Sequence, residues 1–359
     1  MIMTFRENAR YDVVVPTSMG IRITPKNRQP VHTSNEFTMQ VTSAESNVIT
    51  PLASLGKKVR VLTNFVKGSP IARMIKDDLM RRHISYDGPS VDQEGPWGYR
   101  HQINIADSGY GHRGPMVQND RTGEVGRELD LSNFDLTTLF KDEGVRLMHL
   151  SGLIASLSKK TAIFCLGLVE QAKKSGTLIS FDINYRASFW KNRQQELRDV
   201  FQTIAKQSDI LIGNEEDFQL ALGVEGPKPG GKNLNRQMED YQTMLHAMEK
   251  AYPNVTLFAT TLREVINANK HLWGTIVYDM KQVYTVKPKE VQVLDRIGGG
   301  DGFVGGLLYG LLEGMDTLKA MQFGWANGAL VSSLMNDYSE PIDEEQIWSI
   351  WKGNARVKR

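Results

Sequence analysis

The chain has 359 residues, of which 40% are hydrophobic and 23% are charged, and its 43 Lys and Arg nearly balance its 41 Asp and Glu. This length suits one large domain or two. The low net charge, without a basic run of five residues, argues against a nucleic-acid partner. No stretch approaches the ~18 apolar residues of a membrane span. A lone cysteine, Cys165, excludes an internal disulfide and a cysteine-based zinc site, and the N-terminus MIMTFRENARYD lacks an apolar signal region, so we expect a cytoplasmic protein.

Helix-period segments that end in a glycine and lead into β-branched runs recur along the chain. Residues 44–55 (AESNVITPLASL) predict a helix that ends at Gly56, and residues 158–175 predict another, capped by Ser158 and ended by Gly176. Runs without alternation, such as LISFDI and DILIG, indicate strands buried on both faces. Alternating helices and strands favour an α/β fold with a mostly parallel central sheet between helices.

Two polar, Pro- and Gly-rich stretches interrupt this alternation, at residues 20–41 and about 85–125. They contain short alternating strands such as RHQINIAD, and we interpret them as a small β-sheet lid over the main domain; long surface loops are the alternative. The α/β core then comprises residues 12–19, 42–84 and 126–354. Within it, residues 225–236 (EGPKPGGKNLNR) predict a flexible connection.

The most informative segment is 291–312, VQVLDRIGGGDGFVGGLLYGLL. A strand-like run ends at Asp295, and Gly298, Gly299 and Gly300 precede Asp301 and a helix-length apolar run. Three successive glycines are entropically costly unless the backbone must approach another group closely. Ahead of a helix, their N–H groups and the positive end of the helix dipole form an anion site. Asp301 can then accept the proton of a hydroxyl that attacks a bound phosphoryl group.

Two other interpretations of this segment stay open at this point. One is a strand–turn–helix joint with a capping aspartate. The other is a dinucleotide-binding site, because Gly300-x-Gly302-x-x-Gly305 fits the glycine fingerprint. About 20 residues later, however, the chain reads LKAMQFGWANGAL, which is helical and lacks the acidic ribose ligand. A P-loop is excluded, because no G-x-x-x-x-G-K-[ST] occurs.

Several motifs together resemble the ribokinase-like (PfkB) carbohydrate kinases, over residues 12–340. Their C-terminal signature is similar to D-x-x-G-G-G-D-G-F-x-G-G in this chain. The 2-keto-3-deoxygluconate kinases of that family carry a segment that resembles FDINYRASFW (181–190). NEED (214–217) resembles the N-x-x-E motif, TSAESN (42–47) occupies the place of G-G-x-x-x-N, and TTLR (260–263) resembles the nucleotide-loop region. The resemblance implies a three-layer α/β/α fold with a β-sheet lid.

The resemblance also implies ATP-dependent phosphorylation of a sugar hydroxyl with Mg²⁺. Asp301 would be the general base, and the N–H groups of Gly298, Gly299 and Gly300 would form the anion hole. Asn214 and Asp217 would organise magnesium, through water; a plain helix N-cap is the alternative for this motif. The residues implied for nucleotide binding are Asn184, Asn214, Thr260, Thr261, Arg263 and Asn327.

The residues implied for sugar binding come from both the core and the lid. They are Thr42, Ser43, Asn47, Asn104, Asn119, Arg121, Arg186 and Asp337. An arginine such as Arg186 suits a phosphate or a sugar-acid carboxylate, although a surface ion pair or a solvated loop charge is the alternative for it and for Arg121.

Departures from the family pattern concern the sugar rather than phosphoryl transfer. Thr42 and Ser43 stand in place of two glycines of the family pattern, and Asn104 and Asn119 stand where tyrosines are usual. Asp217 replaces a glutamate and has a shorter side chain. The resemblance implies a keto sugar acid as substrate, first of all 2-keto-3-deoxygluconate; because of these departures, a different ketose or anionic sugar, or a non-catalytic sugar-binding relative, is the alternative. The resemblance further implies a homodimer that pairs through the lid, which would also cover an exposed edge strand.

Overall fold

The computed structural model describes residues 3–228 and 238–356. Most of the predicted flexible connection, residues 229–236, lies outside them. Within these two ranges no helix is both long enough and apolar enough to cross a bilayer.

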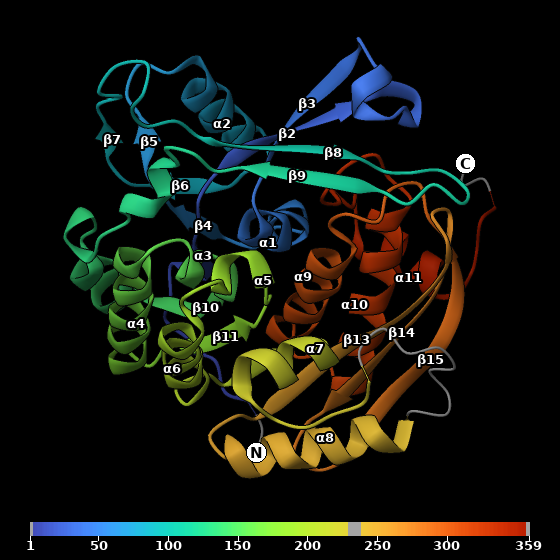
Figure 1. Ribbon diagram of the computed structural model, residues 1–359. Helices are drawn as coiled ribbons and strands as arrows, with labels where there is room; N and C mark the ends of the chain where they lie inside the picture. Colours follow the sequence, from blue (N-terminus) through green and yellow to red (C-terminus); the bar gives the residue numbers. More distant parts are fainter. Residues whose placement is uncertain (1–2, 229–237, 357–359) are drawn as a thin grey trace.

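A nine-stranded sheet forms the centre of the molecule, in the order β15-β14-β13-β12-β11-β10-β1-β4-β6 (Figure 1). All pairings from β6 to β13 are parallel, and the two pairings at one edge, β13 with β14 and β14 with β15, are antiparallel. The predicted, mostly parallel sheet is thus confirmed. The strands are β1 (Tyr11–Pro16), β4 (Val59–Leu62), β6 (Ser85–Asp87), β10 (Val145–Ser151), β11 (Leu178–Asp182), β12 (Ile210–Ile212), β13 (Leu257–Asn267), β14 (Lys270–Tyr278) and β15 (Val283–Gln292).

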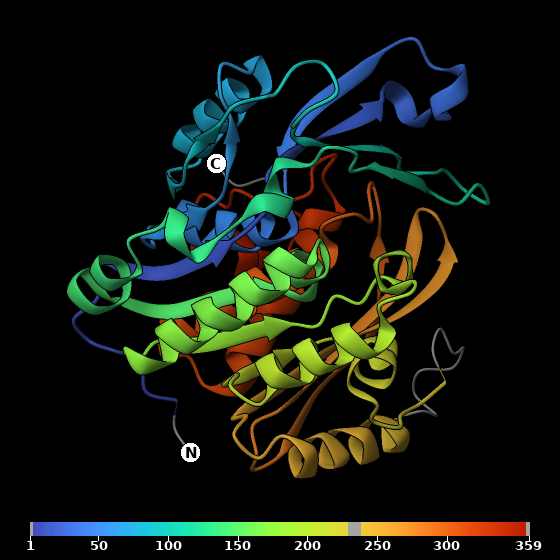
Figure 2. The same ribbon diagram turned by 60° about the vertical axis from the view of Figure 1, so that its left-hand side comes forward.

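Helices cover both faces of this sheet and enclose two apolar cores (Figures 1 and 2). One core includes side chains of α3 (Gly152–Ser156), α4 (Lys159–Lys174), α6 (Gln194–Ala205) and α8 (Met238–Ala251). The other includes side chains of α1 (Ala44–Ser54), α2 (Pro70–Arg81), α9 (Gly299–Leu312), α10 (Thr317–Ser332) and α11 (Glu344–Trp351). This arrangement gives the expected three layers.

The two helices predicted in detail form where expected. The Ser43 hydroxyl accepts a hydrogen bond from the N–H of Ser46 at the start of α1, and Ser158 forms a capping box with Thr161 at the start of α4. Gly56 and Gly176 follow these helices with φ of 86° and 76°, values that favour glycine. Cys165 is fully buried in α4, as predicted for a core residue.

A second sheet, the lid, has the order β3-β2-β8-β9 and lies over the carboxyl ends of the parallel strands (Figure 1). Two of its three pairings are antiparallel, and β2 pairs with β8 in parallel. The first lid segment is close to the predicted one. The second begins later than residue 85, because β6 belongs to the main sheet and β7 pairs with β5. The strands outside the main sheet are β2 (Gly20–Pro25), β3 (Phe37–Thr42), β5 (Phe65–Val66), β7 (Ser90–Val91), β8 (Gln102–Asp107) and β9 (Met116–Asp120).

The tip of the β8–β9 hairpin contacts the tip of the β13–β14 hairpin. The N–H of Gly111 donates to Oδ1 of Asn269 over 2.7 Å, and the N–H of Ala268 donates to the carbonyl of Gly111 over 2.8 Å. Two segments far apart in the sequence thereby close one side of the space beneath the lid. The remaining short elements are α5 (Ala187–Trp190), α7 (Glu215–Asp217), η1 (Lys26–Arg28), η2 (Val31–Thr33), η3 (Val125–Glu128), η4 (Leu131–Asn133), η5 (Thr138–Gly144) and η6 (Phe218–Leu222).

Candidate active site

A cavity of about 940 Å³ lies between the lid and the carboxyl ends of the parallel strands. This is the edge at which open α/β sheets bind ligands. The volume is at the upper end of the usual range for small-molecule sites, so it can hold more than one ligand. The cavity is lined by residues from the loops after β11 and β12, from the N-termini of α1 and α9, and from the inner face of the lid.

The three glycines form the turn that starts α9 at the floor of this cavity. Gly298 caps the helix with φ 80°, and a Cβ there would lie 1.9 Å from the carbonyl oxygen of Asp337. Only glycine fits both constraints. A Cβ on Gly300 would meet no atom within 4 Å, because this residue faces open space. The first backbone N–H groups of the helix are therefore available to an anion in the cavity.

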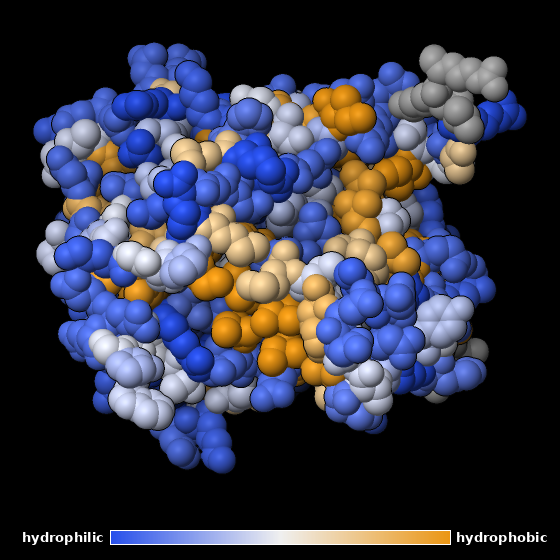
Figure 3. Space-filling view, turned by 90° about the horizontal axis from the view of Figure 1, so that it is seen from above, coloured by the Kyte–Doolittle hydropathy of each residue, from blue (hydrophilic) through white to orange (hydrophobic). Residues whose placement is uncertain are grey.

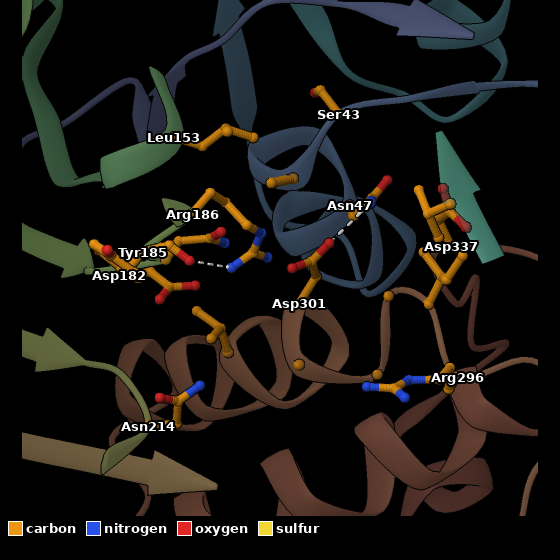
Figure 4. A pocket seen from close by; sticks show the side chains of 18 of the residues that line it. Ser43, Asn47, Leu153, Asp182, Tyr185, Arg186, Asn214, Arg296, Asp301 and Asp337 are labelled. Carbon is orange, nitrogen blue, oxygen red and sulfur yellow. Dashed lines mark hydrogen bonds between the residues drawn. The ribbon is translucent and has the colours of Figure 1, made fainter. Parts of the chain in front are cut away.

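Asp301, in the first turn of α9, is the carboxylate at the centre of the site (Figure 4). Its Oδ2 accepts a hydrogen bond of 2.9 Å from the side-chain amide of Asn47. Burial raises the pKa of Asp301 well above its ordinary value, and the nearby carboxylates of Asp182, Asp337 and Glu45 raise it further, while the Asn47 amide lowers it. A carboxyl with a raised pKa is a stronger base once ionised.

The loops after β11 and β12 bring two further carboxylates to the cavity. Both oxygens of Asp217 accept backbone N–H groups, of Tyr185 and Asn214, each over 2.8 Å, and Asn214 and Asp217 form a capping box at α7. Burial raises the pKa of Asp182 to about 7, with the charge of Asp217 as the next cause, and burial raises that of Asp217 to about 6. Asp182 ends β11 and points into the cavity (Figure 4).

This pair of carboxylates fits a hydrated Mg²⁺ in its chemistry. Burial raises the pKa of both acids, and the charge of Asp217 raises that of Asp182 further, so a divalent cation between them would let both ionise. No cluster of three or more His, Cys, Asp and Glu that could hold a metal occurs in residues 3–228 and 238–356. Magnesium commonly keeps several waters and takes its other ligands from substrate phosphates.

Opposite these acids, the cavity is lined by cationic side chains. Arg186 donates to the carbonyl of Tyr185 over 2.8 Å and extends toward Asp301 (Figure 4). Arg263 and Arg296 also line the cavity, each with one acidic neighbour, Glu215 and Asp295 respectively. Burial and the charge of Arg296 lower the pKa of Arg263 to about 10, and burial, Arg263 and Arg296 lower that of His271 to about 4. Such mutually repelling cations favour an anionic ligand.

The lid contributes polar side chains to the roof. Asn104 on β8 and Asn119 on β9 are cross-strand neighbours that line the cavity, and the side-chain oxygen of Asn104 is buried without a hydrogen-bond partner. Arg121 forms an ion pair of 2.6 Å with Glu124, whose carboxylate also accepts from the hydroxyl of Ser18. The roof therefore presents hydrogen-bonding groups that suit a hydroxylated ligand.

Most of the residues singled out from the sequence line this one cavity. They are Thr42, Ser43, Asn47, Asn104, Asn119, Arg121, Asn184, Arg186, Asn214, Asp217, Thr261, Arg263, Gly298, Gly299, Gly300, Asp301 and Asp337. Thr42, Ser43 and Asp337 already have protein partners: the Thr42 hydroxyl donates to Asp337 over 2.8 Å, and that of Ser43 caps α1.

Two predicted nucleotide-binding residues lie elsewhere. Asn327 is fully buried in α10, where its side chain donates to the carbonyl of Gly302 and accepts from the hydroxyl of Ser339. Thr260 is fully buried within β13. Neither lines the cavity. The segment TTLR is also part of a strand rather than a loop, because β13 and β14 continue as a long hairpin.

The structure also brings residues to the cavity that sequence reasoning missed. Asp182 and Arg296 carried a signal, because each lies within a motif already singled out, FDINYRASFW and the segment 291–312. Arg22 carried none, because its place beneath the lid depends on the pairing of strands far apart in the sequence.

Comparison with known proteins agrees with this geometry. A 5-dehydro-2-deoxygluconokinase of Clostridium perfringens is 24% identical over 331 residues, covering 91% of this chain and 88% of that protein. The crystal structure of a 2-dehydro-3-deoxygluconokinase from Thermotoga maritima matches with a TM-score of 0.85 and 26% identity, over 97% of this chain and 100% of the other. A putative ribokinase II from E. coli in complex with ATP and Mg²⁺ matches with a TM-score of 0.75 and 17% identity, over 96% and 99% of the chains. The model of the pfkB family carbohydrate kinases matches residues 13–343, and the chain belongs to this family of sugar kinases.

Proposed function

We propose that this kinase transfers the γ-phosphoryl group of ATP to a hydroxyl of a keto sugar acid, with Asp301 as general base. The observation that carries the proposal is the position of Asp301: its carboxylate has a raised pKa and lies directly after the glycine turn whose N–H groups face the cavity. Base and anion site are thus adjacent, as in-line transfer to a hydroxyl requires.

The residues divide the reaction between them. Asp301 accepts the proton of the sugar hydroxyl, the hydroxyl oxygen attacks the γ-phosphorus, and the bond between that phosphorus and the ADP oxygen breaks. Backbone N–H groups at Gly298–Gly300 stabilise the charge that develops on the phosphoryl oxygens, for which one preorganised donor is worth ~3 kcal/mol. Arg186, Arg263 and Arg296 would neutralise the remaining phosphate charge.

Asp182 and the Asn214–Asp217 turn would hold Mg²⁺ through its waters, and the ion would neutralise phosphate charge. Both oxygens of Asp217 already accept backbone N–H groups, which favours contact with the ion through water. Loss of Mg²⁺ on chelation should therefore abolish turnover without unfolding the protein.

The substrate class rests on the names of the relatives and on the charge of the cavity. The two similar kinases are named for 5-dehydro-2-deoxygluconate and 2-dehydro-3-deoxygluconate, both of which are deoxy keto sugar acids. Arg121, which follows β9 of the lid, and Arg186, which extends toward Asp301, line the cavity and could pair with a carboxylate. We take 2-keto-3-deoxygluconate as the first substrate to test.

An ADP-release assay over a panel of keto sugar acids and neutral ketoses tests the proposal. We expect turnover with 2-keto-3-deoxygluconate or 5-keto-2-deoxygluconate, and kcat/KM at least tenfold lower for neutral ketoses that lack the carboxylate. Faster turnover of a neutral ketose would overturn the substrate class. Sugar binding by calorimetry without ADP release from any member would identify a non-catalytic sugar-binding protein instead.

The lid also supports a proposed homodimer. Its outer strands β3 and β9 are edges, and they expose Phe37 (38%), Met39 (46%), Met116 (65%) and Val117 (49%). Seen from the lid side in Figure 3, hydrophobic side chains gather near the middle of a mostly hydrophilic face. Light scattering should give twice the chain mass, and Met39→Lys together with Met116→Lys should give the monomer; a monomeric wild type would contradict the pairing.

A further inference from the structure

A buried arginine of the lid lies between two carboxylates of the core. Arg22, on β2, is 2% exposed; its Nη2 pairs with Oδ2 of Asp295, and its Nη1 pairs with Oδ1 of Asp337. Asp295 and Asp337 are 1% and 3% exposed. A buried group of one cation and two anions contributes little to stability, because desolvation offsets the attraction, but it fixes relative position.

Both aspartates contact the segment of the triple-glycine turn, Asp295 through its carboxylate and Asp337 through its backbone. Oδ1 of Asp295 accepts the N–H of Ile297 over 3.0 Å, immediately before Gly298. On the other side, the backbone of Asp337 packs against Gly298 so closely that a Cβ there would lie 1.9 Å from its carbonyl oxygen. Arg22 therefore joins the two segments between which the turn lies.

The same contacts continue to the candidate base. Oδ2 of Asp337 accepts the Thr42 hydroxyl over 2.8 Å, and the oxygen of that hydroxyl lies 3.3 Å from Oδ1 of Asn47. Asn47 in turn donates to Asp301 over 2.9 Å. Buried polar side chains thus adjoin one another from the start of the glycine turn, through Arg22, Asp337 and Thr42, to Asn47, which orients Asp301.

We propose that Arg22 is a positioning residue of the anion site: it couples placement of the lid to the conformation of the turn at Gly298–Gly300. The inference rests on the proposed function, in which this turn binds the transferred phosphoryl group. The turn holds its N–H groups toward the cavity only while both carboxylates are bridged, and the lid strand β2 supplies the bridge.

Two variants separate positioning from general stability. Arg22→Lys keeps the charge, but a single ammonium cannot replace the two-pronged guanidinium. Asp295→Asn leaves the Arg22–Asp337 pair intact and removes one buried charge, so it should fold. Arg113→Lys is the matched control, because Arg113 also pairs with a lid carboxylate, Asp107, over 2.7 Å, but away from the turn.

Hydrogen exchange with mass spectrometry gives a readout that does not depend on activity. We expect amides of residues 297–301 to exchange at least tenfold faster in R22K and D295N than in the wild type and R113K, with α4 unchanged. Unchanged exchange at 297–301 in both variants, or an equal acceleration throughout α4, would overturn the inference.

Kinetics supply the second readout. For R22K and D295N we expect kcat to fall about 10²-fold, the size of effect of one lost preorganised donor, with dissociation constants for sugar and ATP within threefold. A kcat within threefold of the wild type would also overturn the inference. If the wild type releases no ADP with any sugar, the proposed function fails, whereas the exchange result still decides the role of Arg22.

Discussion

The side-chain amide of Asn47, on α1, donates a hydrogen bond of 2.9 Å to the carboxylate of Asp301, on α9. Two helices that start at the same cavity thereby fix the orientation of one oxygen of the candidate base. In the proposed mechanism, the other oxygen accepts the proton of the substrate hydroxyl. The contact also favours the ionised carboxylate, against the effect of burial.

Replacement of Asn47 should move the pH dependence of the reaction. In Asn47→Ala the pKa of Asp301 rises, because a hydrogen bond to its charged form is lost. Since the base acts when ionised, the acidic limb of the pH profile of kcat/KM should move to higher pH, by about one unit for the loss of one hydrogen bond to a charged group. Asn119→Ala, which changes the roof without a contact to Asp301, should leave the limb in place. A limb that moves to lower pH would contradict the assignment.

Removal of the base itself should abolish turnover and spare nucleotide binding. For Asp301→Asn we expect kcat to fall about 10³-fold or more, the usual size of general-base and positioning effects together. Calorimetry with ATP and Mg²⁺ should give a dissociation constant within about threefold of the wild type. Loss of less than tenfold in kcat would exclude Asp301 as the base.

Much of this site could be predicted from the sequence, because its parts are local. The turn at Gly298–Gly300, the base that follows it and the capped turn at Asn214 each lie within a few residues of a strand end. The carboxyl ends of parallel strands meet at one edge, so motifs after different strands converge there. For the same reason the positions of α1 and α4 followed from caps and glycines.

Contacts between distant segments could not be predicted in this way. Arg22 meets Asp295 only because β2 folds over the core, and the strand GIRITP gives no indication of a partner 273 residues later. The length of the β13–β14 hairpin likewise depends on pairing, so TTLR appeared to be a loop. The family resemblance places Asn327 at the nucleotide; in the structure its side chain joins α9 to α10 through the carbonyl of Gly302.

Two glycines of the turn should respond differently to alanine. Gly298→Ala places a methyl group against Asp337 at φ 80°, so the turn must move; we expect a lower melting temperature and a kcat reduced about 10²-fold or more. Gly300→Ala has open space around the new methyl group and should not lower the melting temperature, because alanine also favours the helix by up to ~1 kcal/mol. Thermal unfolding of both variants provides the comparison. An equal fall in the melting temperature of both variants would contradict the tight contact at Gly298 and the open space at Gly300.

The contact between the hairpin tips should affect how well the lid excludes water. Asn269→Ala removes the acceptor for the N–H of Gly111 and the donor to the carbonyl of Val293. We expect the KM for sugar to rise about three- to tenfold and ADP release without sugar to increase, with kcat at saturation little changed, since lid closure sequesters the reaction. Lys281→Ala changes the turn between β14 and β15, at the other end of β14, and should leave the ratio of hydrolysis to transfer unchanged. An unaltered ratio in N269A would mean that the hairpin contact does not control closure.

The raised pKa of Asp301 also has a consequence for stability. Its carboxyl binds a proton more tightly in the folded protein than in the unfolded chain, where the pKa is ~3.9. The contribution of this group to stability is therefore fully present below that pH and is lost as pH rises through the folded-state value.

Asp301→Asn does not titrate, so its melting temperature should equal that of the wild type near pH 4 and exceed it increasingly toward pH 8. The difference should be roughly 1–3 °C for each unit by which the pKa is raised. Asp182 and Glu45, whose charges raise the pKa of Asp301, are present in both proteins, so the difference reports the charge of Asp301 together with its repulsion from them. A difference that shrinks as pH rises would show that Asp301 is instead stabilised in its ionised form, which would remove the physical basis for its role as the base.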